Sequence, residues 1–391
     1  MTESAHPVPP QLERLKTLGG VSAALGLLAC AAGFGLDSEQ FFRSWLFGFL
    51  FWVSIPIGCL SLSFIGHQSG GRWGAVTRRL TEAGTRTFPL LLLLFVPIAA
   101  GLPRLYATWA HPDPHDELVQ AKAAYLNAPF FLGRAALYFA VWMLLAHFLN
   151  KWSLQSDHGH DEGLARKLRK LSGAGLVLMA LTISFMSFDW AMSLDPHWFS
   201  TVYGIWFMIG TLLSAMTFTV VLLVSLAGEA PFEGVVGRDL FHDLGKLTFA
   251  FLMFWAYIGF SQFLIVWSAN LPEEIPWYLR RFQGGWEYLI LAVALLHFAL
   301  PYALLLSQDV KRSRTALRAV AGWLLAMRAL ELYWLVAPDA GQHAGLRPLH
   351  VHWLDVAALA GIGGLWLLYY AHQLAQRPLL PLGEPELLGG A

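Results

Sequence analysis

The chain alternates between long apolar stretches and short polar connections along almost its whole length. About ten stretches contain roughly 20 mainly apolar residues, which is the length that an α-helix needs to cross a lipid bilayer. The pattern therefore predicts an all-α polytopic membrane protein with about ten transmembrane helices. The expected spans are 18–36, 41–65, 88–106, 130–149, 171–192, 198–226, 244–269, 286–306, 316–336 and 353–372.

Weak internal similarity divides these spans into two halves. Short patterns in the second and third spans recur in the same order in the sixth and seventh spans. In the first pattern, Ser44, Gly48 and Phe51 match Ser200, Gly204 and Phe207. In the second pattern, Glu82, Gly84, Thr87 and Phe88 match Asp243, Gly245, Thr248 and Phe249. Four helices separate equivalent positions, so the two repeats are expected to have the same orientation in the membrane. The predicted organisation is an N-terminal segment with the first span (1–40), a first four-helix bundle (41–192), a second four-helix bundle (193–336), and a last span with a tail (337–391).

Lysine and arginine residues are distributed unevenly between the two sides of this topology. Most of the 26 fall on the side that carries both termini, from Arg14 and Lys16 to Arg377. Because cytoplasmic connections are enriched in Lys and Arg, both termini are expected in the cytoplasm. The first span resembles a secretory signal in its charges and small residues, but its length and the spans behind it favour a retained anchor.

Composition narrows the possible functions. The chain of 391 residues is 56% hydrophobic, 13% charged and has zero net charge, so it offers no basic surface for nucleic acid. Cys30 and Cys59 lie inside apolar runs, and no CxxC or CxxCH motif occurs, so covalent haem c and iron–sulfur clusters are excluded. No metal site is expected, and any electrons would have to be carried by another chain.

The most polar interruption between two spans is the stretch from Ser187 to Gly204, which the topology places outside the membrane. It belongs to a wider set of charged residues in the outer half of the membrane, which are candidates for quinone contact or proton transfer: Arg134, Asp189, Asp195, His197, Glu287, Arg328 and Glu331. Ionisable groups at membrane depth are costly and often functional. Two interpretations remain open. These residues could contact quinone or transfer protons, or the arginines could instead neutralise the carboxylates and join the bundles.

A second set lies toward the cytoplasmic side and could form the entrance of a proton path: His67, His147, Asp243, Lys246, His297 and Asp309. Alternatively, Asp243 and Lys246 form a capping pair at the start of the seventh span. His147 and His297 could in principle ligate haem b together, although the absence of a second histidine pair does not favour this.

Several of these residues carry a resemblance to a known family. The stretch from Phe188 to Gly204 has the sequence FDWAMSLDPHWFSTVYG, and two further patterns accompany it, namely Asp243 to Lys246 and the group Arg328, Glu331, Tyr333, Trp334 and Pro338. Over essentially the whole chain the sequence resembles the ActF family, the membrane subunits of bacterial alternative complex III. That family is similar in turn to the NrfD and polysulfide reductase membrane subunits.

The resemblance implies a place in a quinol:electron acceptor oxidoreductase of the bacterial inner membrane. It implies an ActC-like sister membrane subunit, an iron–sulfur subunit and multihaem cytochrome c subunits as partners. It also implies that the sister subunit is the main site of quinol oxidation, and that this chain supplies a scaffold and a proton path. Menaquinone or ubiquinone is the expected non-covalent ligand if the chain contacts quinone at all.

Two other functions fit the same features. A purely structural scaffold is possible if all the buried charges are paired. A secondary transporter also uses repeats and intramembrane charges, but such carriers typically show broken helices at matching positions of the two halves, and this chain has no convincing pair of them.

Overall fold

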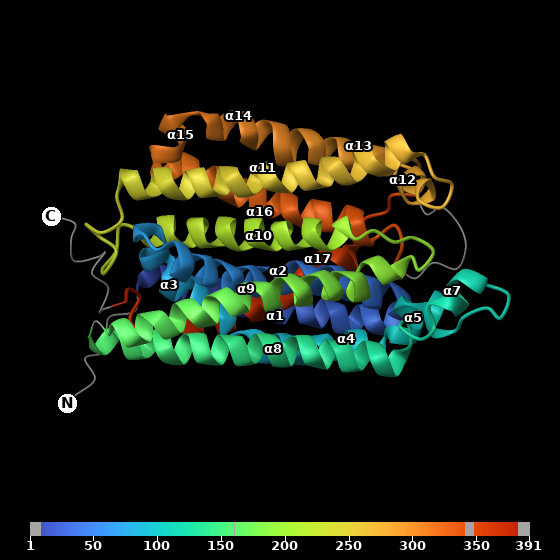
Figure 1. Ribbon diagram of the computed structural model, residues 1–391, viewed down its shortest axis with the longest axis horizontal. Helices are drawn as coiled ribbons and strands as arrows, with labels where there is room; N and C mark the ends of the chain where they lie inside the picture. The colour runs from blue at the N-terminus through green and yellow to red at the C-terminus, as the bar shows by residue number, and fades with distance from the viewer. Residues whose placement is uncertain (1–8, 160, 341–347, 382–391) are drawn as a thin grey trace.

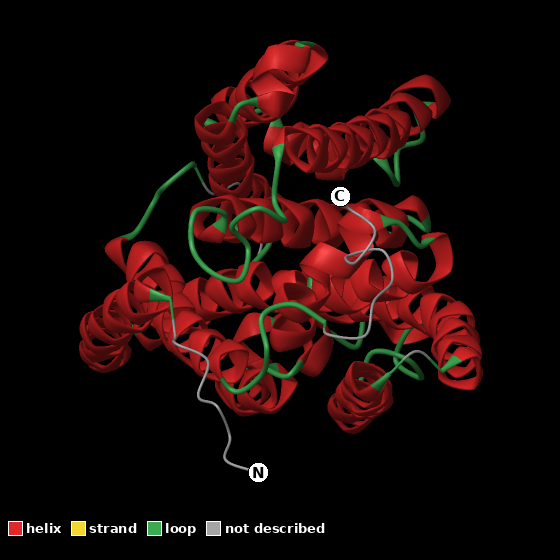
Figure 2. Cartoon of the chain, turned by 90° about the vertical axis from the view of Figure 1, so that its left-hand side faces the viewer, coloured by secondary structure: helices red, strands yellow, loops and turns green. Residues whose placement is uncertain are grey.

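The computed structural model describes residues 9–159, 161–340 and 348–381, and every regular element in these ranges is a helix (Figures 1 and 2). Nine of the described helices are long and apolar enough to cross a membrane, or ten if the bent pair α3 and α4 counts as one span. The predicted fold class is therefore confirmed: the chain is an all-α, multi-pass membrane protein.

The long helices run back and forth between the two ends of the molecule (Figure 1). They are α1 (Pro10–Leu36), α2 (Ser38–Ser69), α3 (Arg72–Thr85), α4 (Phe88–Ala100), α8 (Ala128–Gln155), α9 (Glu162–Trp190), α10 (Val202–Leu226), α11 (Arg238–Ala269), α16 (Arg314–Val336) and α17 (Trp353–Ala375). One further span is composite and consists of α13 (Trp286–Ala292), the π-helical turn η3 (Val293–Ala299) and α14 (Leu300–Leu306).

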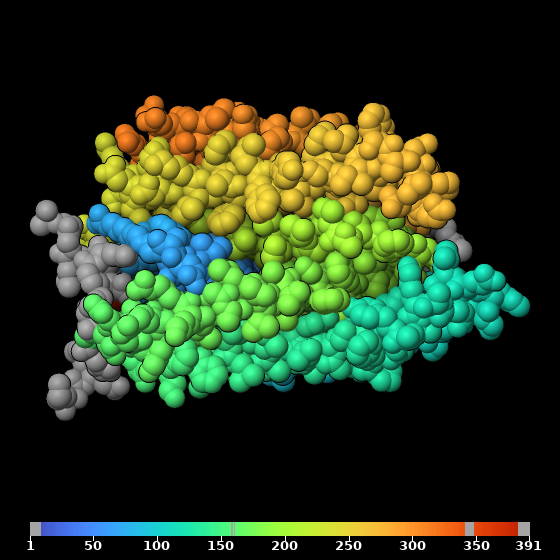
Figure 3. Space-filling model, viewed as in Figure 1, coloured from blue at the N-terminus to red at the C-terminus, as the bar shows by residue number. Residues whose placement is uncertain are grey.

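Short helices lie in the connections between the spans. They are α5 (Leu102–Leu105), α6 (Ala107–Ala110), α7 (Glu117–Ala121), α12 (Ile275–Arg281) and α15 (Gln308–Arg312), with 3-10 turns η1 (Ser156–His158) and η2 (Met192–Leu194). We call the end where α1 begins and α17 ends the terminal end, and the opposite end, which carries α7 and α12, the loop end. The segment around α7 projects beyond the other loops at the loop end (Figure 3).

Helices α2 and α10 form the centre of the molecule. Both are apolar around their whole circumference, with 89% and 83% of their most hydrophobic windows buried. A helix that is apolar on all sides is stable in a membrane protein either against lipid or inside a bundle, and these two pack against each other and against neighbours on every side. Helices α3, α4, α8 and α9 pack around α2, while α11 and α16 pack around α10, and α14 packs against α11 and α16. The division into two sequence repeats stays a prediction.

Helix α1 is joined to α17 through a stripe of small residues. A Cβ atom built on Gly26 would lie 2.3 Å from the Gly361 nitrogen, and one on Gly364 would lie 2.2 Å from the Ala23 nitrogen. Such separations leave no room for larger side chains, so the two backbones touch directly, as small residues permit in membranes. The Ser22 hydroxyl also donates to the Ala360 carbonyl at 2.9 Å.

The structure corrects two expected spans. The third span does not run straight over 88–106, because α4 ends at Ala100 and is preceded by α3, from which it is bent by 41°. The eighth span is not a uniform α-helix, since η3 interrupts it. Helices α9 and α11 also begin before their apolar windows, at Glu162 and Arg238, because polar first turns can remain helical outside the hydrocarbon layer.

Candidate functional site

In the first group of helices, Arg134 of α8 and Asp189 of α9 form a buried ion pair near the loop end. Arg134 Nε and Nη2 each donate to one Asp189 carboxylate oxygen at 2.8 Å. The Tyr138 hydroxyl adds a third hydrogen bond to Asp189 at 2.6 Å. The third Arg134 nitrogen donates to the Tyr125 carbonyl at 2.9 Å, and the guanidinium lies 3.7 Å from the centre of the Tyr125 ring.

Each side-chain nitrogen and oxygen of this pair has a hydrogen-bond partner among the described residues. Both Asp189 oxygens accept hydrogen bonds, and Arg134 donates from all three of its nitrogens. The neighbouring Trp190 packs among the rings of Phe95, Phe139 and Trp142. A bidentate arginine–carboxylate pair that is fully satisfied and surrounded by aromatic rings is well suited to hold α8 against α9.

In the second group of helices, Arg328 and Glu331 of α16 form an ion pair, and both are 1% exposed. The Trp255 indole of α11 donates to Glu331 Oε1 at 2.7 Å. Arg328 Nε donates to the Ser214 hydroxyl of α10 at 3.2 Å. Gly210 makes room for the guanidinium, since a Cβ atom there would lie 2.3 Å from Arg328 Nη2.

His297 completes this group, which we call the Glu331 cluster (Glu331, Arg328, His297, Trp255 and Ser214). The imidazole is completely buried, with Nδ1 3.6 Å from Glu331 Oε2 and the ring centre 4.2 Å from that of Trp255. Neither ring nitrogen has a hydrogen-bond partner among the described residues, and Arg328 Nη2 also has none. The assignment of His297 to a separate cytoplasmic set was therefore wrong, because the residue lies beside Glu331.

The π-helical turn η3 presents His297 to the cluster. A π-helical turn widens the backbone by one residue and changes the direction of the side chains that it carries, and such turns are frequent at functional sites. The Glu331 cluster thus differs from the Arg134–Asp189 pair in one respect. It contains a titratable group, His297, that is buried, lies close to a carboxylate and makes no hydrogen bond within the part of the chain that the structure describes.

The connection between α9 and α10 is held at the loop end by ionic contacts to two other segments. Asp195 pairs with Arg280 of α12. The His197 Nε2 atom lies 2.7 Å from Asp116 Oδ2, and Lys122 Nζ donates to the Pro196 carbonyl at 2.6 Å. The predicted polar interruption is therefore a junction that ties α9 to both the α7 segment and α12.

The pKa values of the carboxyl groups at this junction differ from the ordinary value for aspartate. Burial, with the nearby Asp339 adding to it, raises the pKa of Asp195, although Arg280 opposes the rise. Partial burial alone would raise the pKa of Asp116 as well. Hydrogen bonds from the Val119 backbone and from His197 outweigh that effect, so the pKa of Asp116 lies below its ordinary value.

The other candidate residues do not join these groups. Glu287 accepts a hydrogen bond from the Gly285 nitrogen at 2.8 Å in the first turn of α13. Asp243 and Lys246 form an exposed surface pair at 3.2 Å. The alternative that these two residues pair is confirmed, but the pair does not cap the helix, because α11 begins at Arg238. Asp309 is exposed in the first turn of α15.

The two remaining histidines of the cytoplasmic set lie toward the terminal end. His67 ends α2 with its Nε2 buried and without a partner among the described residues. His147 is exposed on α8. Because α8 and α14 lie on opposite sides of the molecule (Figure 1), His147 and His297 do not face each other as haem ligands would.

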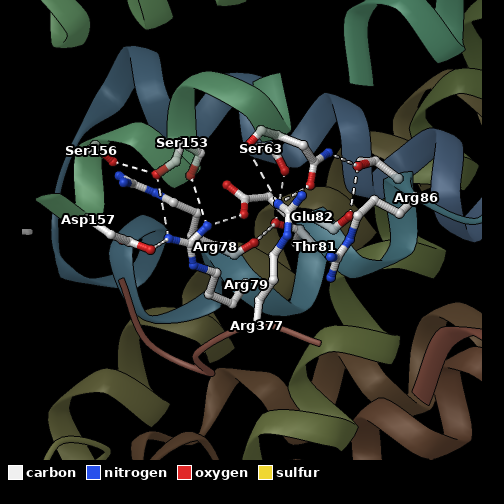
Figure 4. A network of polar contacts seen from close by, with 12 residues as sticks. Ser63, Arg78, Arg79, Thr81, Glu82, Arg86, Ser153, Ser156, Asp157 and Arg377 are labelled. Atoms are coloured by element: carbon white, nitrogen blue, oxygen red, sulfur yellow. Dashed lines mark hydrogen bonds and ion pairs between the residues drawn. The ribbon is translucent and has the colours of Figure 1, made fainter. Parts of the chain in front are cut away.

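The sequence interpretation missed a buried charged network at the terminal end (Figure 4). Arg79 of α3 pairs with Glu82 at 2.7 Å and with Asp157 after α8, and it also donates to the Ser153 hydroxyl at 3.2 Å. Arg79 and Glu82 are 1% and 0% exposed. The signal in the sequence was the i, i+3 spacing of Arg79 and Glu82, which places both on one helical face.

A groove of about 320 Å³ opens near the loop end between α2, α13, α16 and α17. Its lining combines aromatic rings and polar groups, including Phe47, Trp286, Tyr333, His350 and Asp355. The Tyr333 hydroxyl lies 3.2 Å from Asp355 Oδ2, and the Ser44 hydroxyl donates to the other oxygen at 2.5 Å. Small-molecule sites commonly have this composition, an apolar wall with a few convergent polar groups.

Within the described residues, no group of three or more His, Cys, Asp or Glu side chains converges as metal ligands do. Cys30 and Cys59 are both buried and unpaired with each other. Comparison of the chain with known protein families and with curated proteins finds no match.

Proposed function

We propose that this protein is an integral membrane subunit of a respiratory quinol:electron acceptor oxidoreductase of the alternative complex III type, located in the bacterial inner membrane. In this proposal the chain carries no redox group of its own. It contributes a scaffold and a proton path, and the sister membrane subunit is the main site of quinol oxidation. The resemblance of the segment from Phe188 to Gly204 to the ActF family supports this assignment.

One structural observation supports the proton path. His297, buried in η3, lies 3.6 Å from Glu331 and lacks a hydrogen-bond partner among the described residues. Proton transfer requires a donor and an acceptor within hydrogen-bonding reach, and hydrogen bonds that are long in the free protein often tighten in the working complex. We therefore assign His297 and Glu331 to the proton path.

The proposed orientation follows from the distribution of basic residues. Lys and Arg are enriched at the terminal end, so both termini lie in the cytoplasm and the loop end faces the periplasm. The partners are an ActC-like membrane subunit, an iron–sulfur subunit and multihaem cytochrome c subunits. The loop-end junction around Asp195 and His197 is then on the side where protons released by quinol oxidation leave.

The groove lined by Trp286, Tyr333 and Asp355 is the place where this chain would contact a menaquinone or ubiquinone headgroup. Aromatic rings can stack on the quinone ring. The Tyr333 hydroxyl donates to the His350 carbonyl at 2.8 Å, and its oxygen can accept a hydrogen bond from a quinol hydroxyl. The groove opens near the loop end, which agrees with quinol oxidation on the periplasmic side.

A purely structural role is the second candidate, and the Arg134–Asp189 pair favours it. Each polar atom of that pair has a hydrogen-bond partner, so the pair is suited to hold α8 against α9. We therefore assign Asp189 to the scaffold and the Glu331 cluster to the proton path.

The test is purification of the protein from its native membrane with its partners, followed by identification of the partners and a quinol oxidation assay. The proposal expects iron–sulfur and multihaem cytochrome c subunits and quinol-dependent reduction of an electron acceptor. Isolation without any redox-active partner, together with solute uptake by the reconstituted chain alone, would favour a transporter instead.

A further inference from the structure

A second groove, of about 390 Å³, lies at the terminal end between the start of α4, the end of α8 and the end of α17. We call it the basic groove. Its polar lining is rich in cations and amides: Arg86, His147, Asn150, Lys151, Gln373 and Arg377. The remaining lining is apolar or weakly polar: Thr85, Phe88, Pro89, Met143 and Ala146.

Hydrogen bonds fix the two arginines at this groove. Arg86 Nη2 donates to the Gln373 carbonyl at 2.6 Å, and Arg377 Nη1 donates to Asn150 Oδ1 at 2.9 Å. The Arg86 Nε atom is buried and has no hydrogen-bond partner among the described residues. The guanidinium groups are therefore held in place but retain donors for another ligand.

Positive charge at this end is not balanced by the neighbouring carboxylates (Figure 4). Glu82 and Asp157 are both engaged by Arg79. Neither Arg86 nor Arg377 forms a salt bridge with a carboxylate in the part of the chain that the structure describes, and Lys151 is exposed beside them. A group of cations that is partly buried without enough counter-charges favours an anionic ligand.

The surroundings of the basic groove identify the kind of anion. Beyond the apolar lining, the exposed side chains of Leu92, Leu93 and Val96 continue along α4 toward the middle of the membrane. Leu144 and Phe148 of α8 are exposed at the level of the groove itself. Cations at the membrane surface and an apolar track leading away from them match the two parts of a phospholipid. Basic pockets between transmembrane helices recognise anionic headgroups in this way.

We propose that the basic groove binds an anionic phospholipid of the leaflet at the terminal end, with its phosphate against Arg86, Lys151 and Arg377 and an acyl chain along α4 and α8. A free phosphate would use the same cations but not the apolar track. This inference is independent of the proposed respiratory function.

The proposal can be tested on the full-length protein in detergent by native mass spectrometry, with phosphatidylglycerol, phosphatidylcholine or inorganic phosphate added separately. The variants are Lys151→Gln, Arg377→Gln and the double substitution. Lys167→Gln is the matched control, because Lys167 is exposed at the same end on α9 but does not line the groove. A thermal unfolding measurement verifies that each variant is folded.

We expect tighter binding of phosphatidylglycerol than of phosphatidylcholine. Each groove substitution should weaken phosphatidylglycerol binding by about fivefold and the pair by roughly 25-fold, which is the effect of removing one or two basic groups near an anionic lipid. The Lys167→Gln control should bind as the unmodified protein does. Four results would each overturn the proposal. The first two are equal binding of the two lipids and unchanged phosphatidylglycerol binding by folded groove variants. The other two are full competition by inorganic phosphate and variants that lose only a protein partner.

Discussion

His297 Nδ1 lies 3.6 Å from Glu331 Oε2 although 34 residues separate them in the chain, and both side chains are almost completely buried. Glu331 is already paired with Arg328 and bonded to Trp255, whereas His297 has no hydrogen bond among the described residues. The Arg134–Asp189 and Arg328–Glu331 pairs therefore have different expected roles, since both Asp189 oxygens only accept hydrogen bonds from Arg134 and Tyr138, whereas Glu331 has a titratable neighbour.

Replacement of Asp189 by Asn should destabilise the protein. The change leaves the buried Arg134 without a counter-charge, which costs about 3–5 kcal/mol in comparable buried pairs. Tyr138→Phe removes only one hydrogen bond to the same carboxylate and should cost about 1.5–3 kcal/mol. The midpoint of thermal unfolding, followed by tryptophan fluorescence in detergent, should fall more for Asp189→Asn than for Tyr138→Phe. An Asp189→Asn variant as stable as the unmodified protein would contradict the structural assignment of this pair.

Replacement of Gly26 by Leu should separate α1 from α17. A Cβ at this position would overlap the Gly361 backbone, and overpacking typically costs about 1–3 kcal/mol. Gly20→Leu is the matched control, because a Cβ at Gly20 meets nothing within 4 Å. We expect a lower unfolding midpoint for the first variant only. Equal midpoints would show that α1 does not depend on this contact.

The Asp116–His197 contact should make stability depend on pH in a defined direction. Because the pKa of Asp116 is lowered in the folded protein, its stabilising contribution is present above the ordinary aspartate pKa of 3.8 and is lost as the pH falls through the folded value. Asp116→Asn should therefore lower the unfolding midpoint at pH 7 and have a smaller effect near pH 3, where part of the carboxylate is protonated.

Comparing the unfolding midpoints of the unmodified protein and the Asp116→Asn variant at each pH separates the contribution of Asp116 from that of Asp195. The raised pKa of Asp195 acts in the opposite direction, favouring the folded state as the pH falls, but it is present in both proteins. Glu273→Gln, which changes an exposed carboxylate at the same end, should show no such difference. An Asp116→Asn effect of the same size at both pH values would refute the linkage.

The sequence predicts the spans well because a bilayer requires long apolar helices, and such stretches are visible without any tertiary information. It also predicts that Arg134 and Asp189 could pair, since both lie near the outer ends of adjacent spans. The structure adds the detail that Tyr138 and the Tyr125 carbonyl saturate this pair.

Other features depend on tertiary contacts that the apolar pattern does not record. Helix α3 is rich in charge and was expected to be a connection, but Arg79 and Glu82 neutralise each other and allow it to be buried. His297 and Glu331 were assigned to separate sets, because only the tertiary packing of η3 against α16 makes the two side chains neighbours. The Gly26–Gly361 contact was missed because small residues show no hydrophobic signal of their own.

The central claim, that the Glu331 cluster transfers protons in a quinol-oxidising complex, is tested most directly by Glu331→Gln in the purified complex. The substitution keeps the size of the side chain and its hydrogen bond from Trp255 but removes the titratable group. Subunit composition, quinol oxidation and proton release should be measured together. Because the substitution also leaves the buried Arg328 without its counter-charge, we expect less assembled complex. In the complex that does assemble, we expect quinol turnover or proton release to be reduced at least about 100-fold, the lower end for loss of a proton-transfer group. An assembled complex with normal turnover and normal proton release would contradict the claim.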